Sequence, residues 1–193
     1  MIVRTMNLED IKKVREVELA AWGEEAATDE QITQRSLTFP MGSVVVEDEN
    51  GVIVGYAASQ LVDHISTKSW AKQTDNGFIT KTHRPDGQLA YGVSMSGVKN
   101  GVGAAVISYY HDIYIKSGLC SILCLGSRLP GFQAWHNRTK KDIKSYLSDQ
   151  VGGLSRDPEL RLYQKNGFQF LWAINGYFSD AKSLDYGALI VRK

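Results

Sequence analysis

The sequence predicts an α+β fold of the α/β/α type, in which a mixed, mostly antiparallel central sheet carries helices on both faces. Three observations predict this class. Residues 89–125 show the pattern of strand, glycine loop, helix and strand; Asn50-Gly51 separates two β-rich segments; and two further strands follow a helix at 158–165. A doubly wound fold needs several successive parallel crossovers, and the chain has room for only one or two.

The first expected elements are a strand and two helices. Residues 2–5 are β-prone, and Asn7 is typical of an N-cap before apolar residues whose helical spacing continues to Trp22. Thr28 predicts the start of a second helix, which is expected to continue to Leu37. The apolar stripe of each helix is what a helix packed on a core requires.

A hairpin and a long loop follow. Residues 44–47 and 52–62 are rich in β-branched residues, and Asn50-Gly51 between them predicts a type I′ turn, since both central residues of that turn need positive φ. The first part of the sheet is therefore expected to be antiparallel. Residues 63–88 have no clear period, which predicts a long loop, partly folded back over a cleft, of a length that is usually functional or disordered.

The central segment contains a crossover. A strand at 89–95 leads into a glycine-rich loop, and a helix is expected from Ala104 to Ile115, with Gly118 as its C-cap. The apolar residues 122–125 then predict a buried strand, so the two strands should be parallel and the connection right-handed.

The second half of the chain is expected to be less regular. Residues 128–156 form an irregular stretch that contains one helix, at 141–150, which Gly152-Gly153 ends. Asp157 followed by proline predicts the start of the next helix, and Asn166-Gly167 predicts its end. Two closing strands are expected at 168–177 and 186–191.

Composition indicates one ordinary domain without a strong charge. The 193 residues are 43% apolar and 22% charged, with a formal net charge of +1. Nucleic-acid-binding proteins usually have a marked basic excess, so no nucleic-acid partner is expected. No apolar run approaches the roughly 20 residues that span a bilayer, and residues 1–6 show no signal-peptide profile. We therefore expect a cytoplasmic protein with no membrane partner.

The two cysteines, Cys120 and Cys124, lie only four residues apart in one extended segment. Such a pair is unsuited to a disulfide, so both are expected to be reduced and to face the core. No further ligands accompany them, and no metal is expected.

The glycine loop predicts a phosphate site. Glycines let an anion approach the backbone, and the first N–H groups of a helix have no intrahelical partner and lie at its positive end. A P-loop needs Lys and Ser or Thr after the last glycine, where this chain has Ala104-Ala105. The dinucleotide pattern keeps only two of its three glycines, at Gly101 and Gly103, and Arg128 leaves an NADP-binding domain as one alternative.

Two separated motifs resemble the GNAT N-acetyltransferases. The loop at 98–104 is similar to the pyrophosphate loop of that family, although Val98 stands where the family has Arg or Gln. Leu162-Tyr163 with Gly167-Phe168 resembles the family's Leu-Tyr-x-x-x-Gly-Phe ending. Segments 82–87, 126–132 and 157–160 further resemble GNAT domains that occur alone or joined to nitrilase-type carbon–nitrogen hydrolases.

The resemblance implies a single GNAT-like domain over residues 1–193 that transfers the acetyl group of acetyl-CoA to a primary amine. It implies that the backbone of the strand before the loop binds the pantetheine arm and that the loop amides hold the pyrophosphate. Tyr163 is implied as the acid for the leaving thiolate. The cofactor-binding residues expected on this basis are Val93, Met95, Val98, Lys99, Asn100, Gly101, Val102, Gly103 and Ala104.

The acceptor amine and the general base are less defined. Trp70, His83 and Arg128 are candidates for binding a small-molecule or peptide acceptor. No Asp or Glu lies in the strand at 89–97, so His83, Asp86, His111 and a base acting through water all stay open. A non-catalytic acyl-CoA sensor is an alternative function, and the aromatic residues of the long loops suit a homodimer interface equally well.

Overall fold

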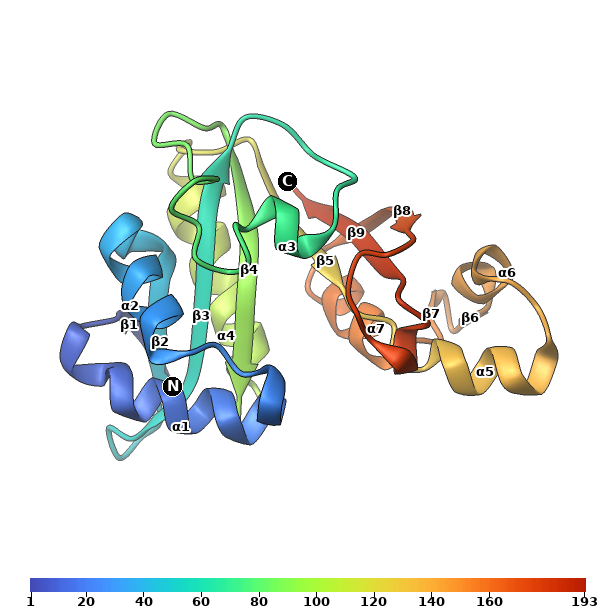
Figure 1. Cartoon of the computed structure of the whole chain (residues 1–193), viewed down its shortest axis with the longest axis horizontal. Helices are drawn as coiled ribbons and strands as arrows, with labels where there is room; N and C mark the ends of the chain where they lie inside the picture. Colours follow the sequence, from blue (N-terminus) through green and yellow to red (C-terminus); the bar gives the residue numbers. More distant parts are fainter. The chain divides into compact units, whose positions relative to one another are not determined.

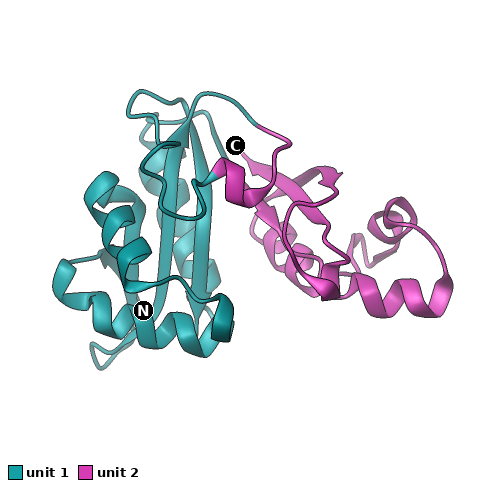
Figure 2. Ribbon diagram, viewed as in Figure 1, with its two compact units in different colours: residues 1–65, 74–123 teal, residues 66–73, 124–193 magenta.

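The computed structural model describes residues 1–193 and contains two compact units (Figure 2). Unit 1 consists of residues 1–65 and 74–123, and unit 2 of residues 66–73 and 124–193. Each unit has its own strands, helices and core. The interpretation of residues 1–193 as one domain stays a prediction.

Unit 1 is built on four antiparallel strands in the order β1-β2-β3-β4 (Figure 1). Its main elements are β1 (Ile2–Thr5), α1 (Ile11–Trp22), α2 (Asp29–Thr38), β2 (Ser43–Glu47), β3 (Ile53–Val62), β4 (Leu89–Gly97) and α4 (Val102–Tyr110). Short 3₁₀ segments are Leu8–Asp10, Gly23–Glu25 and Pro40–Gly42. A π-helical segment (His111–Lys116) continues α4, and Gly118, at φ +79°, follows its end.

Helices contact both faces of this sheet. Glu18 of α1 accepts a hydrogen bond from Ser96 on one face, while Val102 of α4 packs against Gly97 on the other. The predicted fold class, a mostly antiparallel sheet with helices on both faces, is confirmed. Thr28 is the N-cap of α2 as predicted, and it forms a capping box with Gln31.

Strand β4 contains a β-bulge at Val93. Ala58 of β3 pairs with Ser94, and the next residue, Ser59, pairs with Gly92, so Val93 is an extra residue on β4. Directly paired residues share a face of a sheet, and neighbours on a regular strand point to opposite faces. Gly92 and Ser94 therefore lie on opposite faces, although a regular strand would place them on the same one.

The β2–β3 hairpin is confirmed, but its predicted type I′ turn is wrong. Only Gly51 has a positive φ, +73°, whereas Asn50 does not. The Gly51 N–H donates to the Asp48 carbonyl at 3.1 Å, and the Asp48 carboxylate accepts from the N–H groups of Asn50 and Val52 at 3.0 Å each. The Asp48 side chain thus holds a wider turn that the Asn-Gly pair alone does not reveal.

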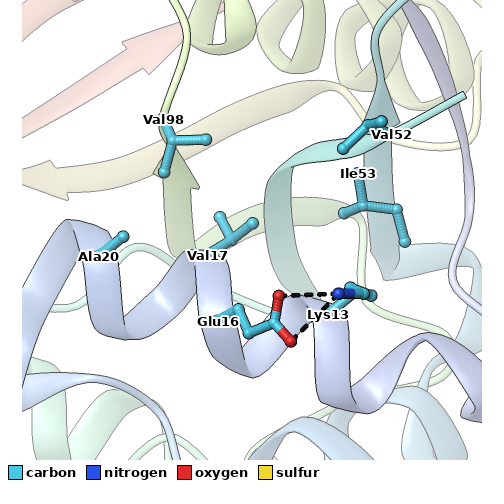
Figure 3. A pocket seen from close by; sticks show the side chains of 7 residues that line it. All are labelled: Lys13, Glu16, Val17, Ala20, Val52, Ile53 and Val98. Carbon is cyan, nitrogen blue, oxygen red and sulfur yellow. Dashed lines mark hydrogen bonds and ion pairs between the residues drawn. The ribbon is translucent and has the colours of Figure 1, made fainter. Parts of the chain in front are cut away.

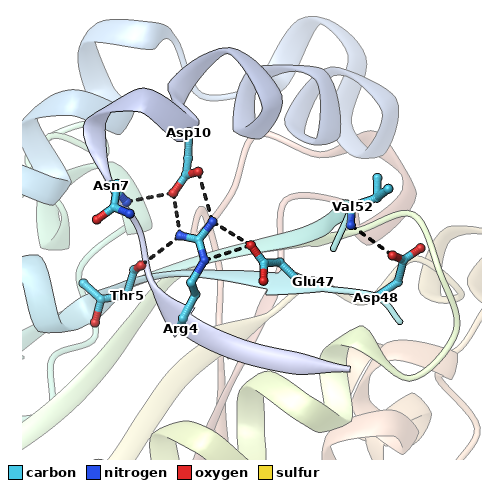
Figure 4. A network of polar contacts seen from close by, with 7 residues as sticks. All are labelled: Arg4, Thr5, Asn7, Asp10, Glu47, Asp48 and Val52. Carbon is cyan, nitrogen blue, oxygen red and sulfur yellow. Dashed lines mark hydrogen bonds and ion pairs between the residues drawn. The ribbon is translucent and has the colours of Figure 1, made fainter. Parts of the chain in front are cut away.

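Arg4 fixes β1 to its surroundings (Figure 4). Its guanidinium bridges Asp10, at 2.7 Å, and Glu47 of β2, also at 2.7 Å. Asp10 accepts from the Asn7 N–H at 2.8 Å as well, so the predicted helix start at Asn7 is confirmed as a capping contact. The hydrogen bond from Arg4 lowers the pKa of Asp10.

Unit 2 contains the strands β5, β9 and β8, adjacent in that order, and a separate two-stranded sheet of β6 and β7. Its elements are α3 (Trp70–Gln73), β5 (Ile122–Ser127, whose first two residues belong to unit 1), α5 (Phe132–Thr139), α6 (Ile143–Ser148), β6 (Gln150–Val151), β7 (Leu154–Ser155), α7 (Pro158–Lys165), β8 (Gln169–Ile174), a 3₁₀ segment (Ala181–Ser183) and β9 (Gly187–Arg192). The loop predicted at 63–88 is largely irregular and contains only the short α3.

The stretch at 128–156 is more regular than predicted. Helix α5 was missed, since its N-cap is Gly131, which offers no side-chain capping signal. The helix expected at 141–150 is shorter, because α6 ends at Ser148 with Asp149 as its C-cap. Gly152-Gly153 does not end that helix, because these residues form the positive-φ turn of the β6–β7 hairpin.

Asp157 joins two of the sequence motifs within unit 2. One carboxylate oxygen caps α7 by accepting from the Glu159 and Leu160 N–H groups, at 3.0 and 3.1 Å. The other oxygen accepts from the Gly131 N–H at 3.0 Å and from the Tyr146 hydroxyl at 2.9 Å. The segments 126–132 and 157–160 are therefore linked by one buried side chain.

Both cysteines are buried, as predicted, and neither forms a disulfide. None of the helices combines the length and apolar character that crossing a membrane requires. No group of three or more His, Cys, Asp or Glu side chains is arranged to hold a metal ion.

Candidate functional site

The glycine loop presents a row of free backbone donors. Gly101 is the N-cap of α4 with φ +93°, a conformation that favours glycine. The first helical bond is donated by the Ala105 N–H to the Gly101 carbonyl at 3.0 Å. Five N–H groups at or before this point have no protein acceptor: Lys99, Asn100, Gly101, Gly103 and Ala104. Such a row of donors at a helix start suits an anion.

Val102 anchors this loop to the sheet. It is 2% exposed, and a Cβ built on Gly97 would lie 2.7 Å from its Cγ1 atom. A Cβ on Gly55 of β3 would collide with the same side chain. Two glycines on neighbouring strands thus form a notch for the first residue of α4, and the notch fixes the loop that precedes it.

The side chains of the loop are less suited to phosphate than its backbone. The Lys99 ammonium is paired with the buried Asp48 carboxylate, and this hydrogen bond raises the pKa of Lys99 and lowers that of Asp48. The Val98 N–H is also occupied, because it donates to the Val54 carbonyl at 3.0 Å. Val98 and Lys99 were both predicted to bind cofactor. The Val98 N–H and the Lys99 ammonium are already paired within the protein, so they are less available to a phosphate than the N–H groups of the glycines that follow.

The Val98 side chain borders a shallow pocket of about 270 Å³ (Figure 3). The other lining residues are Lys13, Glu16, Val17 and Ala20 of α1 with Val52 and Ile53 of the hairpin. The walls are mainly apolar, and the only charges are those of Lys13 and Glu16, which pair at 3.0 Å. The pocket contains none of the other predicted site residues.

Val93 and Met95 lie on β4 at and just beyond the bulge. Val93 is itself the extra residue and is 6% exposed. Bulges interrupt the regular ladder and re-aim backbone groups, and they are frequent beside active sites. The family resemblance implied a cofactor-binding role for this strand, but the bulge could not be predicted, because it depends on the pairing with β3.

A buried carboxylate that the sequence interpretation missed lies against β4. Glu18 of α1 is 1% exposed, and its Oε1 atom accepts hydrogen bonds from Ser94, at 3.2 Å, and from Ser96. Its Oε2 atom accepts from the Ala27 N–H at 2.9 Å. The Trp22 indole N–H donates to the Ser96 hydroxyl at 2.7 Å. The strand that carries no acidic residue therefore has one supplied by a helix.

Tyr163 lies on α7 in unit 2. It is 6% exposed, and its ring meets Phe168 edge-on at 5.4 Å. Its hydroxyl forms no hydrogen bond within the protein, which is unusual for a buried tyrosine. Burial, with a smaller contribution from the charge of Glu159, raises the pKa of Tyr163, so the phenol keeps its proton at neutral pH.

Two of the three predicted acceptor residues come together in unit 2. The Trp70 ring lies 6.4 Å from the ring of Phe178, and the Arg128 guanidinium lies 5.3 Å from the centre of that same ring. Arg128 also pairs with Asp180 at 3.8 Å. Phe178 was not singled out in the sequence, although it links the two residues that were.

His83 lies apart from that cluster, in unit 1. Its ring stacks on Phe39 at 4.5 Å, and its Nδ1 atom accepts from the Leu61 N–H at 3.2 Å. Burial, with a smaller contribution from the Arg84 charge, lowers the pKa of His83. A neutral imidazole has one basic lone pair, and here the backbone occupies it, which disfavours His83 as a general base.

The other two candidate bases lie near the surface. Asp86 is exposed in a turn, and His111 is half-buried at the start of the π-helical segment. Neither side chain forms a hydrogen bond with the loop or with β4. No structural feature favours one of them as a general base.

The comparisons with known proteins agree with this architecture. No model of a protein family matches the sequence. The chain is 28% identical over 174 residues to the uncharacterized N-acetyltransferase YkwB of Bacillus subtilis (strain 168), covering 84% of this chain and 73% of that protein. Its fold is similar to the loading GNATL domain of CurA from Lyngbya majuscula, with a TM-score of 0.85, 20% identity and coverage of 100% and 96%.

A second similar structure is the GphF GNAT-like decarboxylase in complex with isobutyryl-CoA. Its TM-score is 0.79 at 19% identity, with 100% of this chain and 98% of that chain covered. The resemblance to GNAT proteins that the sequence motifs indicated is therefore confirmed in sequence and in fold.

Proposed function

We propose that this GNAT-type chain is an N-acetyltransferase that transfers the acetyl group of acetyl-CoA to a primary amine. The observation that carries the proposal is the row of five free N–H groups from Lys99 to Ala104 at the start of α4. The pyrophosphate of CoA is an anion of the kind that such a helix start binds. The name of the B. subtilis relative supports the same activity.

The backbone is proposed to do most of the cofactor binding. The amides of Asn100, Gly101, Gly103 and Ala104 would hold the pyrophosphate, and backbone groups of β4 near Val93 and Met95 would bind the pantetheine arm and polarise the thioester carbonyl. Because Asp48 pairs with Lys99, the lysine contributes little free charge. The backbone cradle does not depend on the Arg or Gln that Val98 replaces.

Acetyl-CoA binding is tested by thermal shift. A ligand that binds only the folded state stabilises it by about 2.7 kcal/mol at a hundredfold excess over Kd, so the Tm should rise clearly. Gly103→Val should abolish the rise, since the added side chain blocks the approach of phosphate. Ser108→Val makes a comparable β-branched change at an exposed position of the same helix and should retain the rise. A rise with NADP alone would favour an NADP-binding domain instead.

Tyr163 is proposed as the acid that protonates the leaving thiolate. Tyr163→Phe keeps the ring against Phe168 and removes a hydroxyl that makes no protein hydrogen bond, so stability should hold. Loss of a general acid should lower kcat on the order of 10²- to 10⁴-fold, with acetyl-CoA binding nearly unchanged. Steady-state kinetics and thermal shift on the same samples check this. A wild-type kcat in the variant would leave Tyr163 as a core residue.

The acceptor is proposed to bind near Trp70, Phe178 and Arg128. A cation beside aromatic rings suits an amine that also carries a ring or a carboxylate. Substituting Trp70 or Arg128 should raise the KM for the acceptor more than it changes acetyl-CoA affinity. A panel of small amines, amino acids and peptides, followed by thiol release, identifies the acceptor.

A second candidate function is acyl-CoA decarboxylation. Its support is the fold similarity, over the whole chain, to the GphF GNAT-like decarboxylase. Malonyl-CoA is a suitable probe, because a decarboxylase converts it to acetyl-CoA and CO₂ without an amine, and mass spectrometry separates the two thioesters. Conversion of malonyl-CoA with no acetylation of any amine would favour this candidate, and binding without either reaction would favour a sensor.

A further inference from the structure

We propose that Ser94 and Glu18 form a proton relay that deprotonates the acceptor amine, with Ser94 as the catalytic residue and Glu18 acting through it. The inference rests on the proposed N-acetyltransferase function and supplies the base that the sequence left open. It is carried by the hydrogen-bond geometry on the face of β4 that α1 contacts.

Glu18 is held as a fixed proton acceptor. Its Oε2 atom is occupied by the Ala27 N–H at 2.9 Å, which leaves Oε1 for the two serines of β4. The side chain is 1% exposed, so solvent does not compete for these bonds. No lysine or arginine pairs with it through an ion pair.

Ser94 and Ser96 share this carboxylate but differ in what else they can do. Ser96 donates to Glu18 and accepts from the Trp22 indole at 2.7 Å, and it is only 2% exposed, so burial closes its remaining lone pair to a substrate. Ser94 is half-buried, and the only hydrogen bond of its side chain is the one that its hydroxyl donates to Glu18 at 3.2 Å. A hydroxyl that donates inward and has free lone pairs outward can accept an N–H from an amine.

The position of Ser94 on β4 matches the reaction that it would serve. It directly follows the bulged Val93 and precedes Met95, the two residues whose backbone is proposed to bind the cofactor. Ser94 and Ser96 are two residues apart on the regular part of β4 that follows the bulge, so both face Glu18. The acceptor amine would therefore lose its proton beside the strand that holds the thioester.

The proton balance of the step is simple. The ammonium form of the acceptor gives one N–H proton to Ser94 Oγ, as the hydroxyl proton of Ser94 passes to Glu18 Oε1. The neutral amine then forms the C–N bond, and the C–S bond breaks with its electron pair leaving on sulfur. As the amide forms, the second N–H proton passes from the nitrogen to water. The leaving sulfur takes a proton from Tyr163, which regains one from water, and Glu18 returns its proton through Ser94 to solvent.

Ser94→Ala and Ser96→Ala form the matched pair that tests the relay. Both changes remove one hydrogen bond to Glu18, so a purely structural role predicts similar effects, with Ser96→Ala the larger because it also frees Trp22. The relay predicts the reverse: Ser94→Ala should lower kcat on the order of 10²- to 10⁴-fold, and Ser96→Ala by less than about tenfold. Acetyl-CoA affinity, followed by thermal shift, should be nearly unchanged in both.

A second measurement uses the basicity of the acceptor. An alkylamine is protonated at pH 7 and needs a base before it can attack, whereas an arylamine is already neutral. Ser94→Ala should therefore lose far more activity with an alkylamine than with an arylamine, a contrast that a packing defect does not produce. Glu18→Gln, which keeps the side-chain shape but is not basic, should show the same contrast.

The outcomes separate this inference from the function on which it rests. If wild-type protein acetylates an amine and Ser94→Ala does so equally well, or loses as much with arylamines as with alkylamines, the relay is wrong and the proposed function stands. If the wild type binds acetyl-CoA but acetylates no amine, the proposed function and the relay are both overturned.

Discussion

Single residues show where the fold leaves polar groups unsatisfied. Three buried atoms have no hydrogen-bond partner: Arg35 Nη1, Ser43 Oγ and the Tyr56 hydroxyl. The Tyr56 ring is fully buried, and burial raises the pKa of its hydroxyl. By contrast, the buried Tyr110 hydroxyl donates to the Gly42 carbonyl at 2.8 Å. Tyr56 and Tyr110 thus differ in whether the buried hydroxyl forms a hydrogen bond.

This difference predicts unequal effects of the same substitution. The Tyr56 hydroxyl lies beside the Arg35 and Ser43 side chains without a hydrogen bond of good geometry, so Tyr56→Phe should change the free energy of unfolding by less than about 0.5 kcal/mol, whereas Tyr110→Phe removes a well-formed hydrogen bond and should lower it by about 1 kcal/mol. Urea unfolding of the three proteins measures both changes. A loss of stability in Tyr56→Phe would mean that its hydroxyl has a partner, such as a bound water.

At the scale of elements, the structure is most sensitive where one side chain serves several segments. Asp157 caps α7 and also receives bonds from Gly131 and Tyr146. Asp142 caps α6 by accepting from Ser145 of the same helix, whose N–H lies at 2.9 Å. Asp142 is exposed, whereas Asp157 is buried and caps with two N–H groups, so the pair compares a simple surface cap with a buried side chain that also joins two segments.

Asp157→Ala should therefore destabilise the protein more than Asp142→Ala does. A lost N-cap costs typically about 1 kcal/mol, which is the expectation for Asp142→Ala. Asp157→Ala also leaves Gly131 N–H and the Tyr146 hydroxyl without their acceptor, and each unsatisfied buried group adds about 1–3 kcal/mol. Chemical denaturation gives both values. Equal losses would show that the segment 126–132 does not depend on Asp157.

The elements that the sequence predicted are those whose signals are local. The caps at Thr28 and Asp157 and the helix after Gly101 follow from a few adjacent residues, and all three are present. The bulge at Val93 and the turn held by Asp48 were missed, because they depend on pairing or on a side chain outside the turn dipeptide. Glu18 was missed for the same reason, since 76 residues separate it from Ser94.

At the scale of the whole molecule, its carboxyl groups respond to pH in opposite directions. The hydrogen bonds from Arg4 and Lys99 lower the pKa values of Asp10 and Asp48, so their contributions to stability are lost only when the pH falls below their ordinary range. Burial, together with the Asp157 charge, raises the pKa of Glu159 from 4.5 to about 7. Glu159 therefore stabilises the folded state while it is protonated.

The sign of this effect gives a prediction. The contribution of Glu159 is complete below about pH 4.5 and is lost as the pH rises through about 7, so stability should decline across that window. Glu159→Gln, which stays neutral, should flatten the decline, while Glu16→Gln at an exposed ion pair should not. Thermal unfolding from pH 4.5 to 8 measures the slope. An unchanged slope in Glu159→Gln would place the titration elsewhere.

The bulge in β4 shifts by one residue the alternation that decides which side chains face α1 and which face α4. The residues up to Gly92 alternate between the two faces in one register, and the residues from Ser94 onward alternate in the opposite one. The single extra residue therefore decides that both serines face α1 and that Gly97 faces α4. Deleting Val93 would restore the regular phase and exchange the two faces of every residue on one side of it. A sequence alignment with a relative that has no bulge therefore needs a one-residue gap opposite Val93. Without this gap, the alignment would assign the serines to the wrong face of the sheet.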